Sequence, residues 1–287
     1  MKPRFIVNAR SGGAARALPA VRAYAAARGV PVVLTERCGH GAELARAALA
    51  EGCELVVAVG GDGTMNEVAS ALVGTSATLG LVPCGSGDGL GRCLGLHGPA
   101  EHALRVLDHG HPRRIDTGTA DGHPFFTAAG LGFEAEIAQR FNQLTQRGFL
   151  RYLSTAFRLW RQWIPEPYEI THAGGTVRVS AFTLVVTNAN QYGNDARIAP
   201  AARVDDGRLN LTAIPPVTLL RAIPLVVRLF AGDVTRARGV TALVGDHFIV
   251  RRPQPGWLHT DGELRTAGAS VEFRVRPASL SILCPAP

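Results

Sequence analysis

A glycine-rich turn that follows an apolar run is the clearest chemical signal in the sequence. The run from Leu55 to Val59 is rich in β-branched residues and has no polar alternation, which is typical of a strand buried on both faces of a parallel sheet. Gly60, Gly61 and Gly63 then surround Asp62. Glycines let the backbone approach a ligand closely, and the start of a following helix can bind an anion through its free N–H groups. The turn therefore predicts a phosphate site, in which magnesium separates the phosphates from the Asp62 carboxylate.

A purely structural interpretation of this turn stays open. A tight strand-to-helix connection with Asp62 or Thr64 as the N-cap needs the same residue types. A second glycine cluster, Leu81 to Arg92, favours the phosphate site, because it follows the next predicted strand and ends at the same edge of the sheet. The loop from Asn8 to Gly13 lies at that edge too. Neighbouring loops of this kind can bind one polyphosphate together.

Better known phosphate and nucleophile motifs are missing from the sequence. No Gly-Lys-Ser/Thr occurs, which excludes a Walker A loop. Ser86 lacks the glycines two residues to either side that a serine-hydrolase elbow requires. No dinucleotide fingerprint follows the first predicted strand. The nine histidines are scattered without a ligand pattern, so no catalytic role is assigned to any of them.

The elements that position these turns form two patterns along the chain. Up to residue 115, predicted strands alternate with predicted helices, which indicates a parallel doubly wound sheet. After Asp116, predicted strands follow one another with few helices between them, which indicates a mainly antiparallel β domain. We therefore predict an α/β domain over 1–115 and a β-rich domain over 116–277, with about 278–287 packing back onto the first. The site is expected between the two. The predicted strands are Phe5–Val7, Val30–Thr35, Leu55–Val59, Thr78–Val82, Thr176–Asn188, Leu209–Ile214, His247–Arg251, Ser270–Val275 and Leu280–Leu283.

Two further helical stretches carry arginine around an apolar stripe. Glu134 to Trp163 also contains tryptophan, and Val217 to Phe230 is apolar over most of its length. This pattern suits a helix that lies on an anionic membrane face. A core-facing stripe with a solvated basic face explains the same spacing and is somewhat favoured for either helix alone. The candidate lipid contacts in the first stretch are Arg147, Arg151, Arg158 and Arg161.

The bulk composition limits the classes of protein and partner. The chain has 287 residues, 46% of them hydrophobic, and a net charge of +7, which favours acidic partners. Dense Lys/Arg runs interleaved with aromatic residues are missing, so nucleic acid is not expected as a partner. Five cysteines show no CxxC spacing, which fits a reducing compartment and no zinc site. No apolar run is long enough for a signal peptide or a membrane span, so we expect a cytoplasmic protein that is soluble or peripherally bound to a membrane.

The motifs, taken in order, resemble those of the diacylglycerol kinase catalytic family, which includes bacterial lipid kinases and sphingosine kinases. Gly60 to Asn66 is similar to the family's central signature, and Asn8 to Gly13 and Pro83 to Arg92 are similar to its two nucleotide loops. The resemblance implies a phosphofructokinase-like or NAD kinase-like domain that binds ATP and magnesium, followed by a lipid-substrate domain. Further matches extend it over nearly the whole chain, at Asp116-Thr-Gly, Asn188 to Gly193, Ala199-Pro200, Asp205 to Leu209 and Asp261-Gly-Glu263.

The resemblance implies three groups of site residues. Asp206, with backbone oxygens of Arg203 and Arg208, matches a structural metal site. Asp261 and Glu263 match the motif expected to supply a general base, although both stretches also have the residue types of β-turns. Asp62 is expected to act through magnesium. The residues expected to contact ATP are Asn8, Ser11, Gly12, Thr35, Gly60, Gly61, Asp62, Gly63, Thr64, Met65, Asn66, Gly85, Ser86 and Asp88.

The second glycine loop departs from the family pattern at Asp88, where asparagine is expected. Asparagine can donate a hydrogen bond, whereas ionised aspartate cannot. The change puts the nucleotide geometry or full activity in question, unless Asp88 serves the metal.

The resemblance predicts transfer of the γ-phosphate of ATP to a lipid hydroxyl at a membrane surface, for example that of diacylglycerol or a sphingoid base; a homodimer is allowed for. Asp261 is the preferred base, because it follows the apolar Trp257-Leu258 and partial burial would raise its pKa. One alternative is an NAD kinase-like small-molecule kinase, although the Gly-Thr-Pro-Thr-Gly-Ser-like segment typical of that class is missing. The other is a nucleotide-binding regulator without turnover, for which Asp88 is the only hint.

Overall fold

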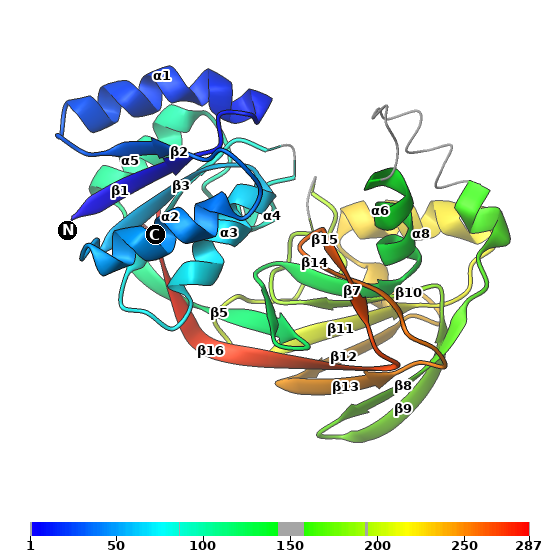
Figure 1. Ribbon diagram of the computed structural model, residues 1–287. Helices are drawn as coiled ribbons and strands as arrows, with labels where there is room; N and C mark the ends of the chain where they lie inside the picture. The colour runs from blue at the N-terminus through cyan, green and yellow to red at the C-terminus, as the bar shows by residue number, and fades with distance from the viewer. Residues whose placement is uncertain (1, 86, 143–157, 193–194, 287) are drawn as a thin grey trace.

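Four parallel strands form the centre of the N-terminal half of the molecule. The computed structural model describes residues 2–85, 87–142, 158–192 and 195–286 (Figure 1). The strands lie in the order β2, β1, β3, β4, and each pairing between them is parallel. Helices α1 and α5 pack together on one face of this sheet, and α2 and α3 pack together on the other (Figure 1). The elements are β1 (Pro3–Val7), α1 (Gly12–Ala26), β2 (Val32–Leu34), α2 (His40–Ala50), β3 (Leu55–Gly60), α3 (Asp62–Leu72), β4 (Thr78–Pro83), α4 (Gly89–Cys93) and α5 (Ala100–His109).

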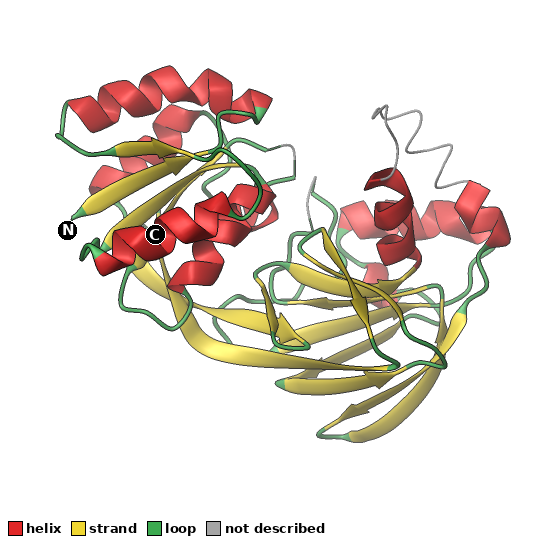
Figure 2. Ribbon diagram, viewed as in Figure 1, coloured by secondary structure: helices red, strands yellow, loops and turns green. Residues whose placement is uncertain are grey.

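The other half of the molecule is a sandwich of two largely antiparallel sheets (Figure 2). A six-stranded sheet has the order β12, β11, β10, β7, β14, β15. The facing layer continues the sheet of the N-terminal half through β5, β6, β16, β13, β8 and β9. The remaining elements are β5 (His111–Ala120), β6 (His123–Phe125), β7 (Ala128–Gly132), α6 (Phe133–Asn142), β8 (Glu166–His172), β9 (Gly175–Ala181), β10 (Thr183–Thr187), β11 (Leu209–Ile214), α8 (Leu219–Ala231), the 3-10 turn η1 (Val234–Arg236), β12 (Thr241–Gly245), β13 (His247–Arg251), β14 (Gly256–Thr260), β15 (Glu263–Ala267) and β16 (Ser270–Cys284).

Strand β10 shows how side-chain alternation builds two cores in this half. Leu184 and Val186 point into the core between the two sheets, where Phe248 and Phe273 also lie. Val185 points to the opposite face and joins a smaller core under α8. Successive residues of a strand face opposite sides, so β10 is apolar throughout because both of its faces are covered. Helices α6 and α8 lie on that outer side of the six-stranded sheet (Figure 1).

Strand β16 connects the two halves of the molecule. Both of its parts pair with β5 in antiparallel fashion; its first part also pairs with β13, and its last part runs parallel to β4, with Ser281 opposite Thr78. The sequence predicts two separate strands here, but the structure has one continuous strand with a register shift between Arg276 and Leu280. A β-bulge of this kind interrupts the apolar alternation without ending the strand. Leu280 and Ile282 therefore belong to the core of the N-terminal half.

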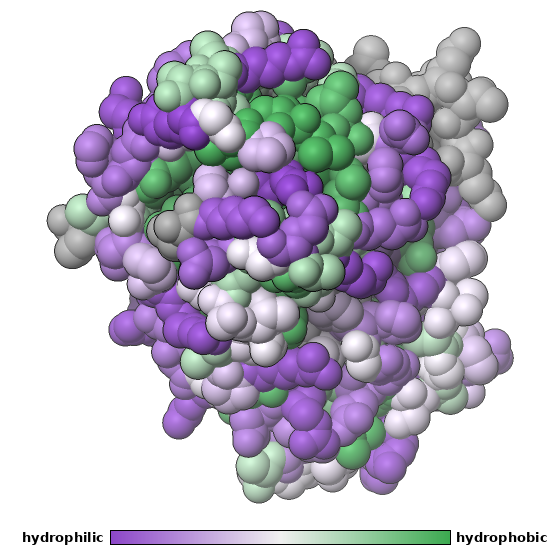
Figure 3. Space-filling model, turned by 60° about the vertical axis from the view of Figure 1, so that its left-hand side comes forward, coloured by the Kyte–Doolittle hydropathy of each residue, from purple (hydrophilic) through white to green (hydrophobic). Residues whose placement is uncertain are grey.

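The structure confirms the predicted fold class, a parallel doubly wound domain followed by a mainly antiparallel β domain. The predicted stretch from Glu134 to Trp163 corresponds to α6 and to a short helical segment over 158–162. Residues 143–157, which include Arg147 and Arg151, lie outside the described residues. None of the described helices is long and apolar enough to cross a membrane. Seen from the side of the N-terminal half, the surface is mostly hydrophilic, with hydrophobic side chains gathered in one area toward the top of the view (Figure 3).

Candidate active site

Three loops at the carboxyl ends of the parallel strands lie against one another, and the first glycine turn among them carries Asp62. This residue is the first of α3, and its carboxylate accepts hydrogen bonds from the backbone N–H groups of Asp88, at 3.0 Å, and Gly89, at 3.1 Å. The two glycine turns approach so closely that a Cβ on Gly85 would lie 2.9 Å from the Cα of Gly61. A Cβ on Gly13 would lie 1.8 Å from the carbonyl oxygen of Cys84. Only glycine fits these two positions, because the backbones of neighbouring loops occupy the space of a side chain.

Asp88 brings a second carboxylate next to Asp62. It has a left-handed backbone, with φ of 45°, and its Oδ1 accepts a hydrogen bond from the N–H of Gly85 at 3.0 Å. The residue is only 4% exposed. Burial raises the pKa of the Asp88 carboxyl, and the nearby charge of Asp62 raises this pKa further. Two neighbouring carboxylates between glycine turns form a site that a divalent cation would stabilise, so these residues fit magnesium.

A cavity of about 330 Å³ opens in front of the first glycine turn. It collects predicted nucleotide residues from three separate stretches of the chain, together with two arginines, Arg10 and Arg37, that the sequence analysis did not single out. Their positive charge suits a polyphosphate. The lining residues are Asn8, Arg10, Ser11, Thr35, Arg37, Cys38, Gly61, Gly63, Thr64 and Glu67.

Not all predicted nucleotide residues line this cavity. Met65 is 3% exposed and belongs to the core of the N-terminal half. Gly60 ends β3, where a Cβ would lie 2.5 Å from the hydroxyl of Thr64. Gly12 begins α1, and Ser86 lies outside the described residues.

A second cavity, of about 610 Å³, lies between the two halves of the molecule. Asn66 and Ser70 of α3 line it on one side, and Glu263 and Arg265 of β15 line it on the other. It shares Cys38 and Glu67 with the first cavity, so the two hollows adjoin. The buried Oδ1 atom of Asn66 has no hydrogen-bond partner among the described residues, which leaves an acceptor for a ligand.

Asp261 and Glu263 differ sharply in their surroundings. Both carboxylate oxygens of Asp261 accept hydrogen bonds from the segment that joins β6 to β7: Oδ2 from the N–H of Phe126 at 2.7 Å, and Oδ1 from the N–H groups of Thr127 and Ala128 at 2.9 Å and from the Thr127 hydroxyl. Burial raises the pKa of Asp261, and these hydrogen bonds oppose the rise. Asp261 therefore anchors the turn between β14 and β15 rather than presenting a free acceptor.

Glu263 is the carboxylate that meets the cavity between the halves. Its side chain is 48% exposed, and it lies 3.1 Å from the guanidinium of Arg265. Burial raises the pKa of Glu263, whereas the charge of Arg265 lowers it. A carboxylate with a raised pKa that faces an open cavity can accept a proton from a bound hydroxyl.

The sequence analysis missed a partly buried polar network next to this turn. Nε2 of His259 lies 2.9 Å from Oε1 of Glu134, and the hydroxyl of Tyr192 donates to Oε2 of Glu134 at 2.5 Å. Nδ1 of His259 accepts a long hydrogen bond, of 3.4 Å, from the N–H of Gly262. Tyr192 belongs to the Asn188 to Gly193 motif, which was the one available signal. The network therefore connects α6 and the loop after β10 to the turn that carries Glu263.

The predicted structural metal site has one exposed carboxylate at its centre. Oδ1 of Asp206 accepts a hydrogen bond from the N–H of Arg208 at 3.0 Å. Neighbouring Asp205 pairs instead with Arg113, at 2.5 Å, and with Arg203, at 3.3 Å. No group of three or more His, Cys, Asp or Glu side chains suited to a metal occurs among the described residues. Asp206 and peptide oxygens alone would hold an ion with most of its ligands supplied by water.

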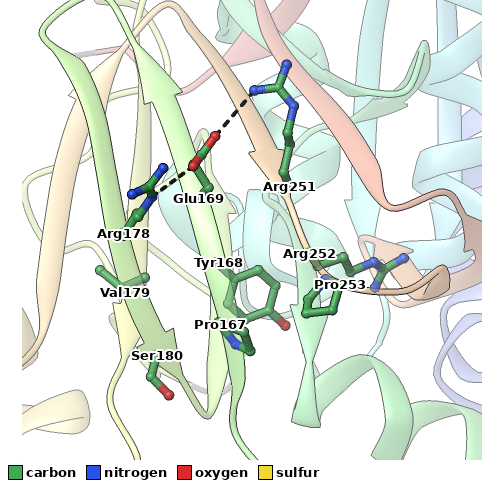
Figure 4. A pocket seen from close by; sticks show the side chains of 9 residues that line it. All are labelled: Pro167, Tyr168, Glu169, Arg178, Val179, Ser180, Arg251, Arg252 and Pro253. Carbon is green, nitrogen blue, oxygen red and sulfur yellow. Dashed lines mark hydrogen bonds and ion pairs between the residues drawn. The ribbon is translucent and has the colours of Figure 1, made fainter.

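A further hollow, of about 500 Å³, is lined by residues of β8, of β9 and of the end of β13 (Figure 4). Its charged groups already have partners. Glu169 lies between Arg178, at 2.9 Å, and Arg251, at 3.6 Å. The guanidinium of Arg252 donates to four backbone carbonyl oxygens. We therefore assign no ligand to this hollow.

Comparisons with known proteins agree with this geometry. Residues 2–120 match the model of the diacylglycerol kinase catalytic domain, and residues 127–284 match that of the YegS C-terminal NAD kinase beta sandwich-like domain. The chain belongs to the family of proteins that combine these two domains. A relative from Chromohalobacter salexigens, named "Probable lipid kinase YegS-like", is 32% identical over 230 residues, which cover 78% of this chain and 74% of the relative.

More distant relatives extend the same picture. The diacylglycerol kinase of Bacillus subtilis is 27% identical over 236 residues, which cover 80% of this chain and 77% of that protein. A crystal structure of a diacylglycerol kinase from Bacillus anthracis superimposes with a TM-score of 0.76 and 17% identity, covering 99% of this chain and 96% of that one. At this identity the likeness shows the fold alone.

Proposed function

We propose that the protein is an ATP-dependent lipid kinase, which transfers the γ-phosphoryl group of ATP to the hydroxyl of a lipid such as diacylglycerol or a sphingoid base. The observation that carries this proposal is that the two cavities adjoin. The first glycine turn lines one cavity, Glu263 lines the other, and both cavities contain Cys38 and Glu67. A phosphate donor in the first cavity and a hydroxyl acceptor in the second would meet at this shared wall.

The N-terminal half supplies the nucleotide side of the reaction. Backbone N–H groups at the glycine turns and the start of α3 suit phosphate oxygens, and Arg10 and Arg37 add positive charge. Asn8, Ser11 and Thr35 line the same cavity and can donate hydrogen bonds to ATP. Asp62 and Asp88 would hold magnesium, which neutralises charge on the phosphates when bound. In this assignment Asp88 binds the metal, so this position does not need the hydrogen-bond donor that an asparagine would supply.

The other half supplies the acceptor side. Glu263 would take the proton of the lipid hydroxyl. At the same time the hydroxyl oxygen would form the new bond to the γ-phosphorus, and the bond from that phosphorus to the leaving ADP would break. Arg265 lies 3.1 Å from Glu263, and its charge lowers the pKa of that carboxyl against the rise caused by burial. Asp261 is a positioning residue in this scheme, because its hydrogen bonds fix the turn on which Glu263 lies.

The direct test is an assay of the purified protein with ATP, magnesium and a panel of acceptors in mixed micelles. Diacylglycerol, sphingosine, phosphatidylglycerol and NAD cover the acceptor classes. We expect ADP and a phosphorylated lipid to form in equal amounts, with no phosphorylation of NAD. Phosphorylation of NAD alone would replace the proposal with the small-molecule kinase. ATP binding without turnover on any acceptor would indicate a nucleotide-binding regulator.

A lipid acceptor also requires access to a membrane. Since none of the described helices is suited to span one, we propose peripheral association. The charge of +7 favours an anionic membrane face.

A further inference from the structure

Helix α8 carries large apolar side chains on two opposite sides. Leu225 and Leu229 pack on the core beneath it, together with Val185 and Ile214. Its outer face, which we define as Leu220, Ile223, Val226, Val227 and Phe230, is exposed to between 51% and 83%. These five account for most of the eight large hydrophobic side chains that are exposed in the described part of the chain. A helix that is apolar all round is normally buried on all sides, so the outer face is a candidate contact surface.

The spacing places these side chains on one stripe. Leu220, Ile223, Val227 and Phe230 follow one another at intervals of three, four and three residues, which align along an α-helix. Pro224 interrupts the backbone N–H pattern but does not break the helix. The described part of the earlier stretch behaves differently, because Leu159 is 2% exposed and Trp163 packs against Phe133 at 5.8 Å. The core-facing interpretation thus suits that segment, whereas α8 departs from it.

The chain segment that contains α8 carries mostly positive charges. Residues 217–240 contain four arginines, at 221, 228, 236 and 238, and one acid, Asp233, which gives a net charge of +3 for this segment. Asp233 pairs with Arg228 at 3.4 Å. Arg236 and Arg238 are exposed, and so is Arg197, whose backbone N–H donates to the carbonyl of Leu229. An apolar stripe with arginine beside it matches a helix that lies in the interface of an anionic bilayer.

The same charges disfavour a second copy of the chain as the occupant. A symmetric contact between two α8 helices would place one positive segment against another. A protein partner with an apolar groove could bind the apolar stripe, but such a contact would give the neighbouring arginines no role.

We propose that the outer face of α8 docks on an anionic phospholipid bilayer, with its apolar side chains entering the acyl boundary and Arg236 and Arg238 contacting headgroup phosphates. This goes beyond the proposed kinase reaction, because it assigns a membrane contact to a helix that lines neither cavity of the active site. Figure 1 shows α8 beside α6 on the side of the sandwich away from β8 and β9. In the docked protein, this side of the C-terminal half would therefore face the bilayer.

Cosedimentation with vesicles tests the docking without ATP. A negative result would therefore disprove the docking and leave the kinase assignment untouched. The probes are vesicles of phosphatidylcholine alone and vesicles that also contain phosphatidylglycerol. The double variant Ile223→Ser/Val227→Ser should lose binding to the anionic vesicles by about tenfold for each side chain. Arg236→Gln/Arg238→Gln should weaken binding and flatten its salt dependence. Val244→Ser, which changes an exposed valine of β12, is the matched control and should bind as the unchanged protein does.

Three outcomes would overturn the proposal. The first is unchanged vesicle binding by Ile223→Ser/Val227→Ser with an unchanged melting temperature. The second is equal binding of the unchanged protein to neutral and anionic vesicles, or no binding to either. The third is a dimer in light scattering that this double variant converts to a monomer, which would make the outer face a contact between copies. Turnover of a short-chain lipid dispersed in detergent should stay the same in all these variants, because none of the residues lines the active site.

Discussion

The imidazole Nε2 of His259 lies 2.9 Å from the carboxylate Oε1 of Glu134, directly above Gly130 of β7. A Cβ on Gly130 would lie 1.7 Å from that oxygen, so the strand carries glycine where the pair needs space. His259 precedes the turn that carries Glu263, and the N–H of Gly262 donates to its Nδ1. Since Nδ1 accepts, the proton of a neutral imidazole is on Nε2 and points to Glu134. The pair therefore sets the position of this turn.

Tyr192→Phe tests the positioning role of this network, because it removes only the hydroxyl that donates to Glu134. We expect kcat to fall by about tenfold, which corresponds to about 1.5 kcal/mol for a lost hydrogen bond to a charged group. The KM for ATP should stay the same, because the network does not touch the nucleotide cavity. In a Glu263→Gln background the same change should cost nothing further, since the network acts through Glu263. An equal loss in both backgrounds would show that Tyr192 does not act through Glu263.

Glu263→Gln and Asp261→Asn should separate the base from its support. Glu263→Gln removes a carboxylate that faces the cavity, so turnover should fall by about 10²-fold to 10⁴-fold while ATP binding and the melting temperature persist. Asp261→Asn replaces an acceptor of four hydrogen bonds with an amide that can satisfy them only in part. It should lower the free energy of unfolding by about 1–3 kcal/mol. If Glu263→Gln turns over normally and Asp261→Asn is stable but inactive, Asp261 is the base after all.

Asp88→Asn should stabilise the nucleotide-free protein at neutral pH. The folded state raises the pKa of Asp88 above its ordinary value of 3.8, so the folded chain holds the proton to a higher pH than the unfolded chain does. Stability from this group is present below pH 3.8 and is lost as pH rises through the folded pKa. Above that point Asp88→Asn should therefore have the higher melting temperature in magnesium-free buffer, and the gain should shrink as the solution is acidified. Asp246→Asn, a change of an exposed carboxylate, is the control for the lost charge. A gain independent of pH would contradict this account.

The fold could be predicted largely from the local pattern of the sequence. β3 and β4 are buried along their whole length, and such apolar runs indicate central parallel strands without knowledge of their neighbours. β7 was missed because its sequence, Ala-Ala-Gly-Leu-Gly, has weak strand propensity. It forms a strand because Ala129 and Leu131 fill the core on one side and Gly130 admits the Glu134 and His259 pair on the other. That reason depends in part on His259, which is more than one hundred positions away in the chain.

The candidate site, too, could be predicted only where it depends on local sequence. The adjacency of the glycine turns follows from parallel strands, whose carboxyl ends share one edge of the sheet. The difference between Asp261 and Glu263 does not follow from the sequence, since it depends on where the N–H groups of Phe126, Thr127 and Ala128 lie. The burial of Asp88 beside Asp62 likewise depends on how two loops pack.

The loop around Asp206 allows a test of the predicted metal that does not depend on turnover. Both oxygens of buried Asp116 accept backbone hydrogen bonds at 2.7 Å, from Gly207 and Ala278, so this carboxylate braces the loop with or without an ion. Asp116→Asn should therefore lower the free energy of unfolding by about 1–3 kcal/mol in both EDTA and magnesium. Asp206 is exposed and accepts one hydrogen bond, so Asp206→Asn should change stability by less than about 0.5 kcal/mol in EDTA. If Asp206 binds magnesium, adding the ion should raise the melting temperature of the unchanged protein but not that of Asp206→Asn, because an ion that binds only the folded state stabilises it by mass action. An equal rise in both proteins would place the stabilising ion elsewhere, and no rise in either would remove Asp206 from the set of metal ligands.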